Sequence, residues 1–337
     1  MTLRVGINGF GRTGRTAFRA WWEQRRGDFE IVAINRGPVG IRTHLLRHDS
    51  DYGRFPAEIV DLAHSFKVDG HEVAVFNADD PAAIPWRDAG VDLVIESTGQ
   101  FRDRKSAAVH LHDGVRKVVI SAPAKGVDWT VIMGANDEQY RPAEHAVISA
   151  GSCTTNCVVL AVKVLNDAFG VRRGFMTTIH SYTGDQNLVD NSHKDLRRAR
   201  AAALNIVPTS SGASEAVGQI IPALAGKFDG LAYRVPTPTV SVLDLVTDLR
   251  DSPSVGAINE AYLAAAEGSL KRYLHYEREE LVSMDFKGHP ASAIHDAPST
   301  MVLDGDMAKT MAWYDNEWGY SSRLVDVCAM IAERGLG

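Results

Sequence analysis

The chain has 337 residues, of which 45% are apolar and 23% charged, as in an ordinary globular protein with room for two domains. Its net charge of −6 argues against non-specific nucleic-acid binding, and no apolar stretch reaches the roughly 20 residues that span a bilayer. Three cysteines cannot form a disulfide framework, and no signal-peptide pattern is visible. We therefore expect a cytoplasmic protein without nucleic-acid or membrane partners.

The first half of the chain alternates short β-branched runs with helical stretches. Alternation of this kind implies a doubly wound parallel sheet. The helix predicted over residues 12–25 carries Phe18, Trp21 and Trp22 on its apolar side. The strands are predicted over residues 4–8, 29–35, 91–97, 115–121 and 146–149.

The second half has longer extended runs and therefore predicts a mixed α+β domain. A helix is expected over residues 254–267, and an amphipathic helix over 322–334 is expected to pack back on the first domain. The extended runs are residues 174–181, 231–235, 240–249 and 311–314.

A glycine pattern follows the first predicted strand and opens the first helix. Gly9, Gly11 and Gly14 form the G-x-G-x-x-G spacing that allows a tight turn, close approach to a pyrophosphate and close helix–strand packing. A generic glycine-rich turn is the alternative, but the strand before and the helix after favour a dinucleotide site.

Arg36 follows Asn35 at the end of the second strand, where an NAD-preferring site usually has a carboxylate for the ribose 2′-hydroxyl. A guanidinium attracts a 2′-phosphate and can bind it with two parallel hydrogen bonds. The sequence therefore favours NADP over NAD, with a solvated loop arginine as the alternative.

Cys153 lies at a strand-to-helix junction, between the apolar runs 146–148 and 158–165. Unpaired amides and the helix dipole at such a junction favour the thiolate, which attacks carbonyl carbon. His180 ends another predicted strand, and an imidazole near the thiol could stabilise the anion and move protons. Taken alone, His180 has a structural alternative. Cys157, one helical turn after Cys153, is expected to be a small buried residue.

Six segments resemble phosphorylating glyceraldehyde-3-phosphate dehydrogenase, in order and with the family's spacing over almost the whole chain. The hexapeptide Ser-Cys-Thr-Thr-Asn-Cys is highly specific. The resemblance implies a homotetrameric enzyme that oxidises glyceraldehyde 3-phosphate with inorganic phosphate to 1,3-bisphosphoglycerate, with Cys153 as nucleophile and His180 as base. The segments are residues 8–12, 152–157, 180–186, 195–200, 234–238 and 313–320.

The resemblance also implies two phosphate sites, a cofactor site and no metal. The substrate phosphate would meet Thr183, Asp185, Arg198 and Arg234, and the attacking phosphate would meet Ser152, Thr154, Ser211 and Gly212. The cofactor, NADP or NAD, would meet Gly9, Gly11, Arg12, Thr13, Gly14, Asn35, Arg36, Ser97, Thr98, Gly99, Ser121, Ser192, Asn316 and Tyr320.

The predicted fold class is thus α/β, with an N-terminal Rossmann-type doubly wound parallel sheet and a C-terminal α+β catalytic domain with a mixed sheet. Residues 1–152, completed by a C-terminal helix over 318–337, would form the NAD(P)-binding domain. Residues 153–317 would form the catalytic domain.

The chain departs from the family pattern at several positions. Ala150 and Gly151 stand before the nucleophile where Asn and Ala are usual. Ser192 lies in a segment that, in NADP-using relatives, comes from a neighbouring subunit and accepts the 2′-phosphate, so it supports the prediction from Arg36. Asp79 stands where relatives often have arginine, and its carboxylate would oppose a phosphate.

Two other functions are weighed. An erythrose-4-phosphate dehydrogenase would use water instead of phosphate, but its members usually lack the Tyr-Thr-Gly that follows His180 here. A non-catalytic, nucleotide-binding paralogue with a regulatory role is disfavoured by the intact Cys153, His180 and phosphate residues.

Overall fold

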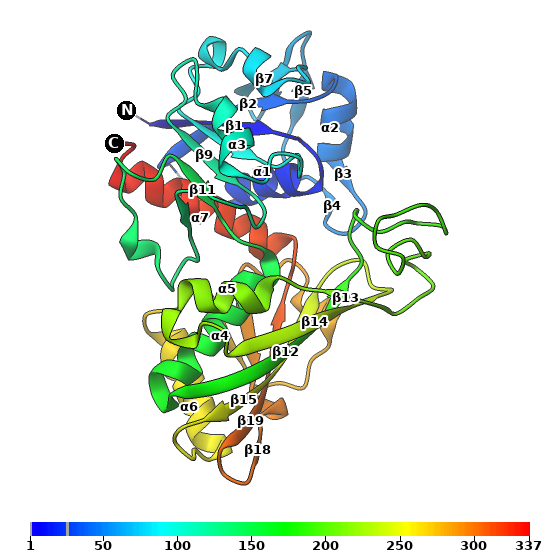
Figure 1. Ribbon diagram of the computed structural model, residues 1–337. Helices are drawn as coiled ribbons and strands as arrows, with labels where there is room; N and C mark the ends of the chain where they lie inside the picture. Colours follow the sequence, from blue (N-terminus) through cyan, green and yellow to red (C-terminus); the bar gives the residue numbers. More distant parts are fainter. Residues whose placement is uncertain (1, 25–26) are drawn as a thin grey trace. The chain divides into compact units, whose positions relative to one another are not determined.

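The computed structural model describes residues 2–24 and 27–337, so the predicted helix end at Arg25 lies outside the described residues (Figure 1). The chain divides into two compact units. The first contains the described residues up to Val131 with Asp137–Gly151 and Ser321–Gly337, and the second contains Ile132–Asn136 and Ser152–Tyr320.

The first unit is built on a nine-stranded sheet in the order β10-β11-β9-β8-β1-β2-β7-β6-β5. All neighbours from β10 to β7 are parallel, whereas β5 and β6 add an antiparallel edge that the sequence analysis missed. The strands are β1 (Leu3–Asn8), β2 (Phe29–Asn35), β5 (Ile59–Asp61), β6 (Ser65–Val68), β7 (His71–Phe76), β8 (Leu93–Glu96), β9 (Lys117–Ile120), β10 (Trp129–Thr130) and β11 (Val147–Ser149). The helices are α1 (Arg12–Gln24), α2 (Val39–Arg47) and α3 (Arg104–Ala107), and a small hairpin pairs β3 (His48–Asp49) with β4 (Gly53–Arg54).

The strand order of this sheet reverses at β1. The chain runs outward from β1 through β2 to β7 and then returns to β8 on the other side of β1. In open parallel sheets, ligands bind beyond the carboxyl ends of the strands at this reversal. The residues after β1 and β8 therefore occupy the position of a ligand site.

The second unit has an eight-stranded mixed sheet with helices α4 (Cys153–Phe169), α5 (Ala213–Ile220) and α6 (Val255–Glu267) against one face (Figure 1). The predicted α/β class, with a parallel sheet and a mixed sheet, is confirmed. The strand path is β13 (Val207–Ser210), β14 (Phe228–Val235), β12 (Val171–Ser181), β15 (Ser241–Leu249), β19 (Met307–Tyr314), β17 (Ala293–Asp296) and β16 (Leu274–Glu277), with β18 (Met301–Leu303) paired to β19.

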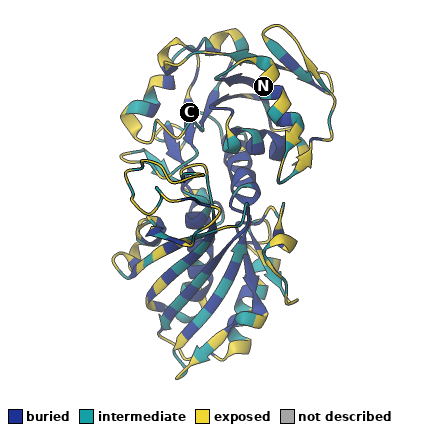
Figure 2. Cartoon of the chain, turned by 90° about the vertical axis from the view of Figure 1, so that its right-hand side faces the viewer, coloured by how far each residue is buried: buried dark blue, intermediate teal, exposed yellow. Residues whose placement is uncertain are grey.

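Alternation along β12 determines which side chains face the helices. Met176, Thr178 and His180 are buried, whereas Phe175 on the other face is 68% exposed. Figure 2 shows this alternation of buried and partly exposed residues along the strands. Because side chains point to opposite faces with a period of two, His180 and Thr178 lie on the side of the sheet that carries α4.

The C-terminal helix α7 (Trp318–Arg334) corrects one prediction. The sequence predicts an amphipathic helix, but every residue from Ser321 to Ile331 is buried, polar ones included. Arg323 and Asp326 form an ion pair of 2.6 Å within the helix, so these two buried charges neutralise each other without contact with water. Of the described helices, none has the length and apolar character that a membrane span requires.

Candidate active site

Cys153 is the first residue of α4. Ser152 caps the helix, and its hydroxyl accepts a hydrogen bond of 3.0 Å from the Thr155 amide. The cap fixes the first turn and holds the Cys153 thiol among amides that have no intrahelical acceptor. Cys153 is partly exposed, whereas Cys157 and Cys328 are buried, and none of the three forms a disulfide. Cys157 is therefore the buried small residue that was predicted.

His180 lies beside the thiol. Its Nε2 is 3.4 Å from the Cys153 Sγ, and its Nδ1 is 2.7 Å from the Ser181 carbonyl oxygen. Arg234 NH1, which can only donate, also lies 3.2 Å from Nδ1, but the Ser181 carbonyl is closer and can only accept. The shorter contact favours a proton on Nδ1, with the Nε2 lone pair facing the sulfur. This is the tautomer that a base for the thiol proton needs.

Burial dominates the electrostatics of this pair. It raises the pKa of the Cys153 thiol, although Arg234 and hydrogen bonds from Thr154 act in the opposite direction. It also lowers the pKa of His180 to about 3, and Arg234 lowers it further. A neutral thiol and a neutral imidazole are therefore favoured. The sequence predicted a thiolate from the helix terminus alone, and it missed desolvation, which penalises both charged forms.

Arg234 stands directly opposite His180 because β14 pairs with β12 in parallel register at these two residues. Its NH1 donates to the Thr183 hydroxyl at 2.7 Å and to the Ser181 carbonyl at 3.2 Å. Its Nε–H is buried without an acceptor. A buried cationic donor without a partner beside a nucleophile is suited to bind an anion.

The residues predicted for the substrate phosphate form one connected group with Arg234. The Thr183 hydroxyl donates to Asp185, and NH1 of Arg198 donates to the other oxygen of the same carboxylate. Burial acts to raise the pKa of Asp185, but Thr183, Arg234 and Arg198 outweigh it and lower the pKa. Asp185 thus holds both a hydroxyl and a guanidinium in place next to Arg234.

The residues predicted for the attacking phosphate are less well connected. Ser152 is engaged in the helix cap, and the Thr154 hydroxyl lies 3.9 Å from the Cys153 Sγ. Ser211 and Gly212 join β13 to α5, where the Ser211 hydroxyl accepts from the Ala213 amide at 3.3 Å. Among the described residues, no hydrogen bond joins Ser211 or Gly212 to Cys153, so their role stays a prediction.

Tyr314 is a residue of this site that the sequence analysis did not single out. Its hydroxyl lies 3.0 Å from the Thr154 hydroxyl on α4 and 2.6 Å from the Thr178 hydroxyl on β12. Its ring meets the His180 imidazole edge-on, with centroids 6.0 Å apart. Tyr314 therefore links the two elements that carry Cys153 and His180. Burial alternates along β19, where Ala312 and Tyr314 lie on the buried face. This alternation is what marks Tyr314 as an inward-facing residue.

The three glycines after β1 have three different surroundings. Gly9 has a φ of +94°, and a side chain there would lie 2.7 Å from the Thr98 amide. A side chain at Gly14 would lie 2.3 Å from the Gly9 carbonyl oxygen, whereas a Cβ added at Gly11 would meet nothing within 4 Å. Gly9 and Gly14 thus allow close packing, and Gly11 leaves the open backbone that a pyrophosphate can approach.

The other predicted cofactor residues of the first unit gather at the same strand ends. The Ser97 hydroxyl donates to the Gly9 carbonyl at 2.7 Å, and the Ser121 amide donates to the Glu96 carbonyl at 2.9 Å. Gly99 has open space around it, and Thr13 lies half-buried in the first turn of α1.

Two side chains predicted to bind the cofactor are engaged within the protein. The Arg12 guanidinium pairs with Asp49 and with Asp51, so only its backbone at the start of α1 remains available. The Asn35 amide is buried and bonds to Asn8 at 2.7 Å and to the Ala78 carbonyl at 2.9 Å. Asn35 therefore holds the end of β2 in place.

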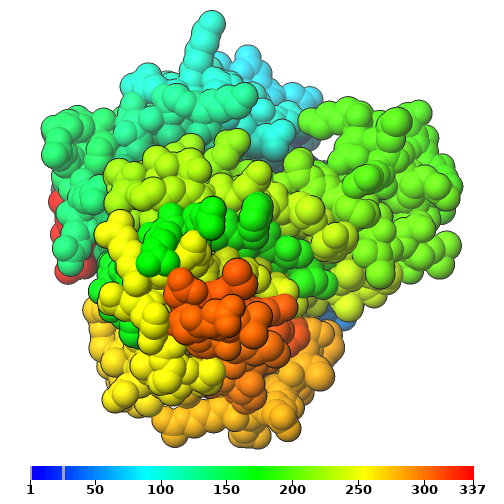
Figure 3. All heavy atoms as spheres, turned by 60° about the horizontal axis from the view of Figure 1, so that its bottom comes forward, coloured from blue at the N-terminus to red at the C-terminus, as the bar shows by residue number. Residues whose placement is uncertain are grey.

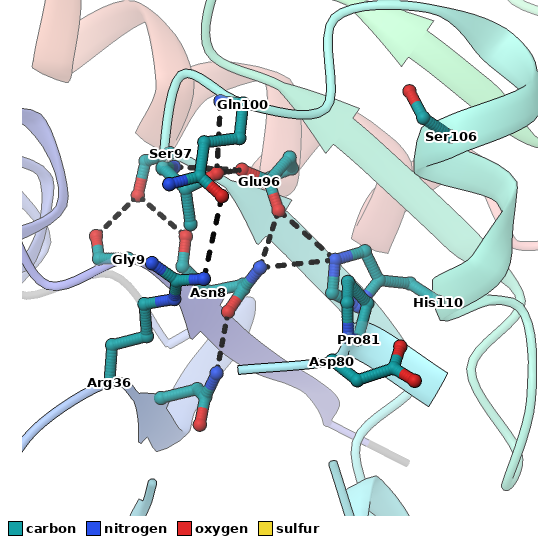
Figure 4. Close-up of polar contacts among 12 residues, drawn as sticks. Asn8, Gly9, Arg36, Asp80, Pro81, Glu96, Ser97, Gln100, Ser106 and His110 are labelled. Atoms are coloured by element: carbon teal, nitrogen blue, oxygen red, sulfur yellow. Dashed lines mark hydrogen bonds and ion pairs between the residues drawn. The ribbon is translucent and has the colours of Figure 1, made fainter. Parts of the chain in front are cut away.

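A buried polar network lies beneath these strand ends (Figure 4). The Glu96 carboxylate accepts from the Thr98 amide at 2.7 Å, Asn8 Nδ2 at 2.6 Å and His110 Nε2 at 3.0 Å. Trp86 Nε1 lies 3.3 Å from His110 Nδ1, and because an indole only donates, the His110 proton is on Nε2 and points to Glu96. Sequence reasoning missed this network, whose members are far apart in the chain.

Arg36 is held at the end of β2 with a φ of +84°, a conformation uncommon for a residue with a side chain. Its NH2 donates to Gln100 Oε1 at 3.4 Å (Figure 4). The same NH2 donates to the Asp79 carbonyl at 3.3 Å. The Asp79 carboxylate is 3.8 Å away and fully exposed. The Arg36 Nε–H is buried without an acceptor.

The remaining predicted residues lie in the second unit. The Asn316 Oδ1 accepts from the Ser181 hydroxyl at 2.9 Å and the Ser241 hydroxyl at 3.1 Å, and burial raises the pKa of the Tyr320 hydroxyl. Ser192 is exposed on the irregular segment 182–206, which forms the bright green lobe in Figure 3.

The second unit also has a hollow of about 960 Å³ whose lining includes Phe175, Ser211, Lys227 and Met307 but neither Cys153 nor His180. Its lining has no cysteine and no histidine, so we place the chemistry at the Cys153–His180 pair. Among the described residues, no group of three or more His, Cys, Asp or Glu could hold a metal ion.

Comparison with known proteins gives concordant matches. Residues 3–104 match the family model "Glyceraldehyde 3-phosphate dehydrogenase, NAD binding domain", and residues 152–316 match "Glyceraldehyde 3-phosphate dehydrogenase, C-terminal domain". The chain is 51% identical over 337 residues to glyceraldehyde-3-phosphate dehydrogenase of Geobacillus stearothermophilus, with 100% of both chains covered. It is 53% identical to glyceraldehyde-3-phosphate dehydrogenase 2 of Streptomyces arenae, with 98% of this chain and 99% of the relative covered.

Proposed function

Because the chain belongs to the glyceraldehyde-3-phosphate dehydrogenase family and is an NAD(P)-dependent dehydrogenase, we propose that it oxidises glyceraldehyde 3-phosphate and inorganic phosphate to 1,3-bisphosphoglycerate. The observation that carries this proposal is the His180 Nε2 at 3.4 Å from the Cys153 Sγ, beside an arginine with an unpartnered Nε.

The first half of the reaction uses the thiol and the imidazole. Cys153 adds to the aldehyde carbon while its proton passes to His180 Nε2, and the imidazolium then gives this proton to the former carbonyl oxygen, so that a hemithioacetal forms and His180 is neutral again. His180 then removes the hydroxyl proton as a hydride leaves the same carbon, which becomes a thioester. The nicotinamide of the bound cofactor supplies the hydride acceptor.

The second half releases the product. A phosphate oxygen attacks the thioester carbon, the C–S bond breaks, and the acyl phosphate leaves Cys153 as a thiolate. Arg234, Arg198 and Thr183 have the cationic and hydroxyl donors that phosphate groups require. The first-turn amides of α4 and a protonated His180 would stabilise the developing oxyanion.

We propose NADP as the preferred cofactor. Arg36 occupies the position at which NAD-preferring sites usually carry a carboxylate, and a carboxylate would repel a 2′-phosphate. The buried Nε–H of Arg36 lacks an acceptor. Arg36→Asp should shift the ratio of kcat/KM values toward NAD. A tenfold or greater preference of the unmodified enzyme for NAD would overturn this part of the proposal.

We also propose a homotetramer, and domains divided as the sequence predicts, at residues 152 and 318. Exposed apolar side chains on the open sheet face and on segment 182–206 support association, because a single chain leaves them in water. They are Phe175, Leu188, Val189, Leu196, Leu204 and Ile206. Light scattering that gives the mass of one chain would overturn the tetramer.

The decisive experiment is an absorbance assay of reduced-nicotinamide formation. It crosses NADP and NAD with glyceraldehyde 3-phosphate and erythrose 4-phosphate, each with and without phosphate. We expect phosphate-dependent turnover of glyceraldehyde 3-phosphate that Cys153→Ser abolishes. Phosphate-independent turnover of erythrose 4-phosphate would favour the water-using enzyme instead, and nucleotide binding without turnover would favour the regulatory paralogue.

A further inference from the structure

Three arginines of the first unit share an unusual feature. Arg15 on α1, Arg36 after β2 and Arg42 on α2 each have a buried Nε–H without an acceptor. Buried donors are nearly always satisfied in folded proteins, so three unsatisfied ones indicate that an acceptor is missing. Arg19 has the same feature, but its NH2 bonds to the Leu46 and Gly53 carbonyls and is committed to the protein.

The Arg42 guanidinium lies directly over the backbone of Gly37, the residue after Arg36. An ideal Cβ at Gly37 would be 2.3 Å from Arg42 NH2, and the φ of Gly37 is +102°. Glycine at position 37 is therefore required for the Arg42 guanidinium to lie against the backbone there. Burial first and Arg36 second lower the pKa of Arg42, so the two cations repel each other across a partly desolvated space.

Few carboxylates are available to pair with Arg15, Arg36 and Arg42. The Asp49 and Asp51 carboxylates are taken by Arg12, and Asp79 is a distant, exposed partner of Arg36. The Arg15 side chain has one hydrogen bond to a described residue, from NH1 to the Phe10 carbonyl at 3.3 Å. For Arg15 and Arg42, no carboxylate of the described residues lies within ion-pair distance. A dianion at this place would remove the repulsion and satisfy the unpaired donors.

The end of β2 is where the adenosine ribose of a dinucleotide lies when its pyrophosphate is on the glycine loop. We propose that Arg42, together with Arg15, joins Arg36 in binding the 2′-phosphate of NADP. This inference rests on the proposed function, whose cofactor site it completes. The guanidinium groups of Arg36 and Arg42 together offer more directed donors to a phosphate than Arg36 alone. Arg42 would therefore help to determine the specificity for NADP over NAD.

The test measures binding of 2′,5′-ADP and 5′-AMP to the full chain by titration calorimetry, because the two probes differ only in the 2′-phosphate. Arg42→Gln should weaken 2′,5′-ADP about 10- to 100-fold, as expected for a lost charged hydrogen bond, and leave 5′-AMP within about twofold. The kcat/KM for NADP should fall by the same factor, with kcat/KM for NAD unchanged. Arg15→Gln should give a smaller loss of the same kind.

Arg87→Gln is the matched control, since Arg87 is 77% exposed and its loss changes the net charge equally. If the unmodified chain prefers 2′,5′-ADP but neither Arg42→Gln nor Arg15→Gln weakens it more than the control does, this inference fails while the NADP proposal stands. If the unmodified chain binds both probes equally, the inference and the NADP proposal fail together. Oxidation with NAD, measured on the same samples, then still tests the activity.

Discussion

The Nε2 of His180 lies 3.4 Å from the Sγ of Cys153, although 27 residues separate them in the chain. The contact arises because His180 is on the helix-facing side of β12 and Cys153 begins the helix that covers this side. The Ser181 carbonyl favours the imidazole tautomer that sets the pair for proton transfer from sulfur to nitrogen.

Replacing the base tests this arrangement. His180→Asn should lower kcat about 10²- to 10⁴-fold, the usual contribution of a positioned general base. Steady-state kinetics with glyceraldehyde 3-phosphate measure it, and His64→Asn, at an exposed position, serves as the control. A kcat within threefold of the unmodified enzyme would remove His180 from the mechanism.

Arg234 should control how easily the thiol ionises. Burial raises the pKa of Cys153 and the positive charge of Arg234 lowers it, so Arg234→Leu should raise it further. The rate of alkylation by neutral iodoacetamide should then fall at pH 7, and its pH profile should move to higher pH. The buried Cys157 and Cys328 will not compete for the reagent. An unchanged profile would mean that solvent screens Arg234 from the sulfur.

The tyrosine behind the pair gives a prediction that separates positioning from stability. Tyr314→Phe removes the hydroxyl shared with Thr154 and Thr178 and should cost about 0.5–1.5 kcal/mol in unfolding free energy, with a severalfold loss of kcat. Tyr262→Phe loses a similar buried bond, to the Ala161 carbonyl at 2.9 Å, and should cost similar stability without loss of kcat. Equal losses of kcat in both variants would argue that Tyr314 only stabilises the fold.

Buried histidines should make the protein sensitive to acid. Burial lowers the pKa of His180 and His295 to about 3 and that of His289 to about 4, whereas the unfolded value is about 6.5. Between these values the unfolded chain binds more protons, so stability falls as the pH drops below about 6.5. Each histidine adds at most about 1.4 kcal/mol per pH unit. Urea midpoints at pH 7.5 and pH 5 measure the loss, and His295→Asn should reduce it; a midpoint independent of pH would contradict the assignment.

What the sequence predicts well in this chain is local. The spacing of Gly9, Gly11 and Gly14 identifies the nucleotide loop because strand, turn and helix are contiguous, and the structure gives each glycine different surroundings. The strands that were predicted, such as β1, β2 and β8, and the start of α4 at Cys153 follow from the same short-range patterns.

What the sequence does not predict depends on pairing between distant strands. The opposition of His180 and Arg234 is set by the register of β12 and β14, which no local pattern encodes. The pKa shifts of Cys153 and His180 have burial as their largest cause, and burial is a property of the packed unit. Arg42 was overlooked because only the fold brings its side chain over Gly37.

The network beneath the nucleotide loop yields the last prediction. Glu96 is a buried carboxylate whose four donors come from Asn8, His110 and both polar groups of Thr98. Glu96→Gln places an N–H₂ group against some of these donors, so the Thr98 and Asn8 backbone should loosen where the cofactor lies. Because this change is common to every nucleotide, the dissociation constants of NAD and NADP should rise by the same factor, and unfolding free energy should fall by about 1–3 kcal/mol.

Calorimetric titration of both cofactors measures the effect, with Glu58→Gln, an exposed change of equal charge, as the control. A loss confined to NADP would contradict the network's role, since it would place the effect at the 2′-phosphate. Arg42→Gln should instead raise the dissociation constant of NADP and leave that of NAD unchanged. Comparing Glu96→Gln with Arg42→Gln therefore distinguishes a network that supports every nucleotide from a contact to the 2′-phosphate alone. The strand ends that carry Thr98 and Asn8 are neighbours in one sheet, which is why one carboxylate can hold both.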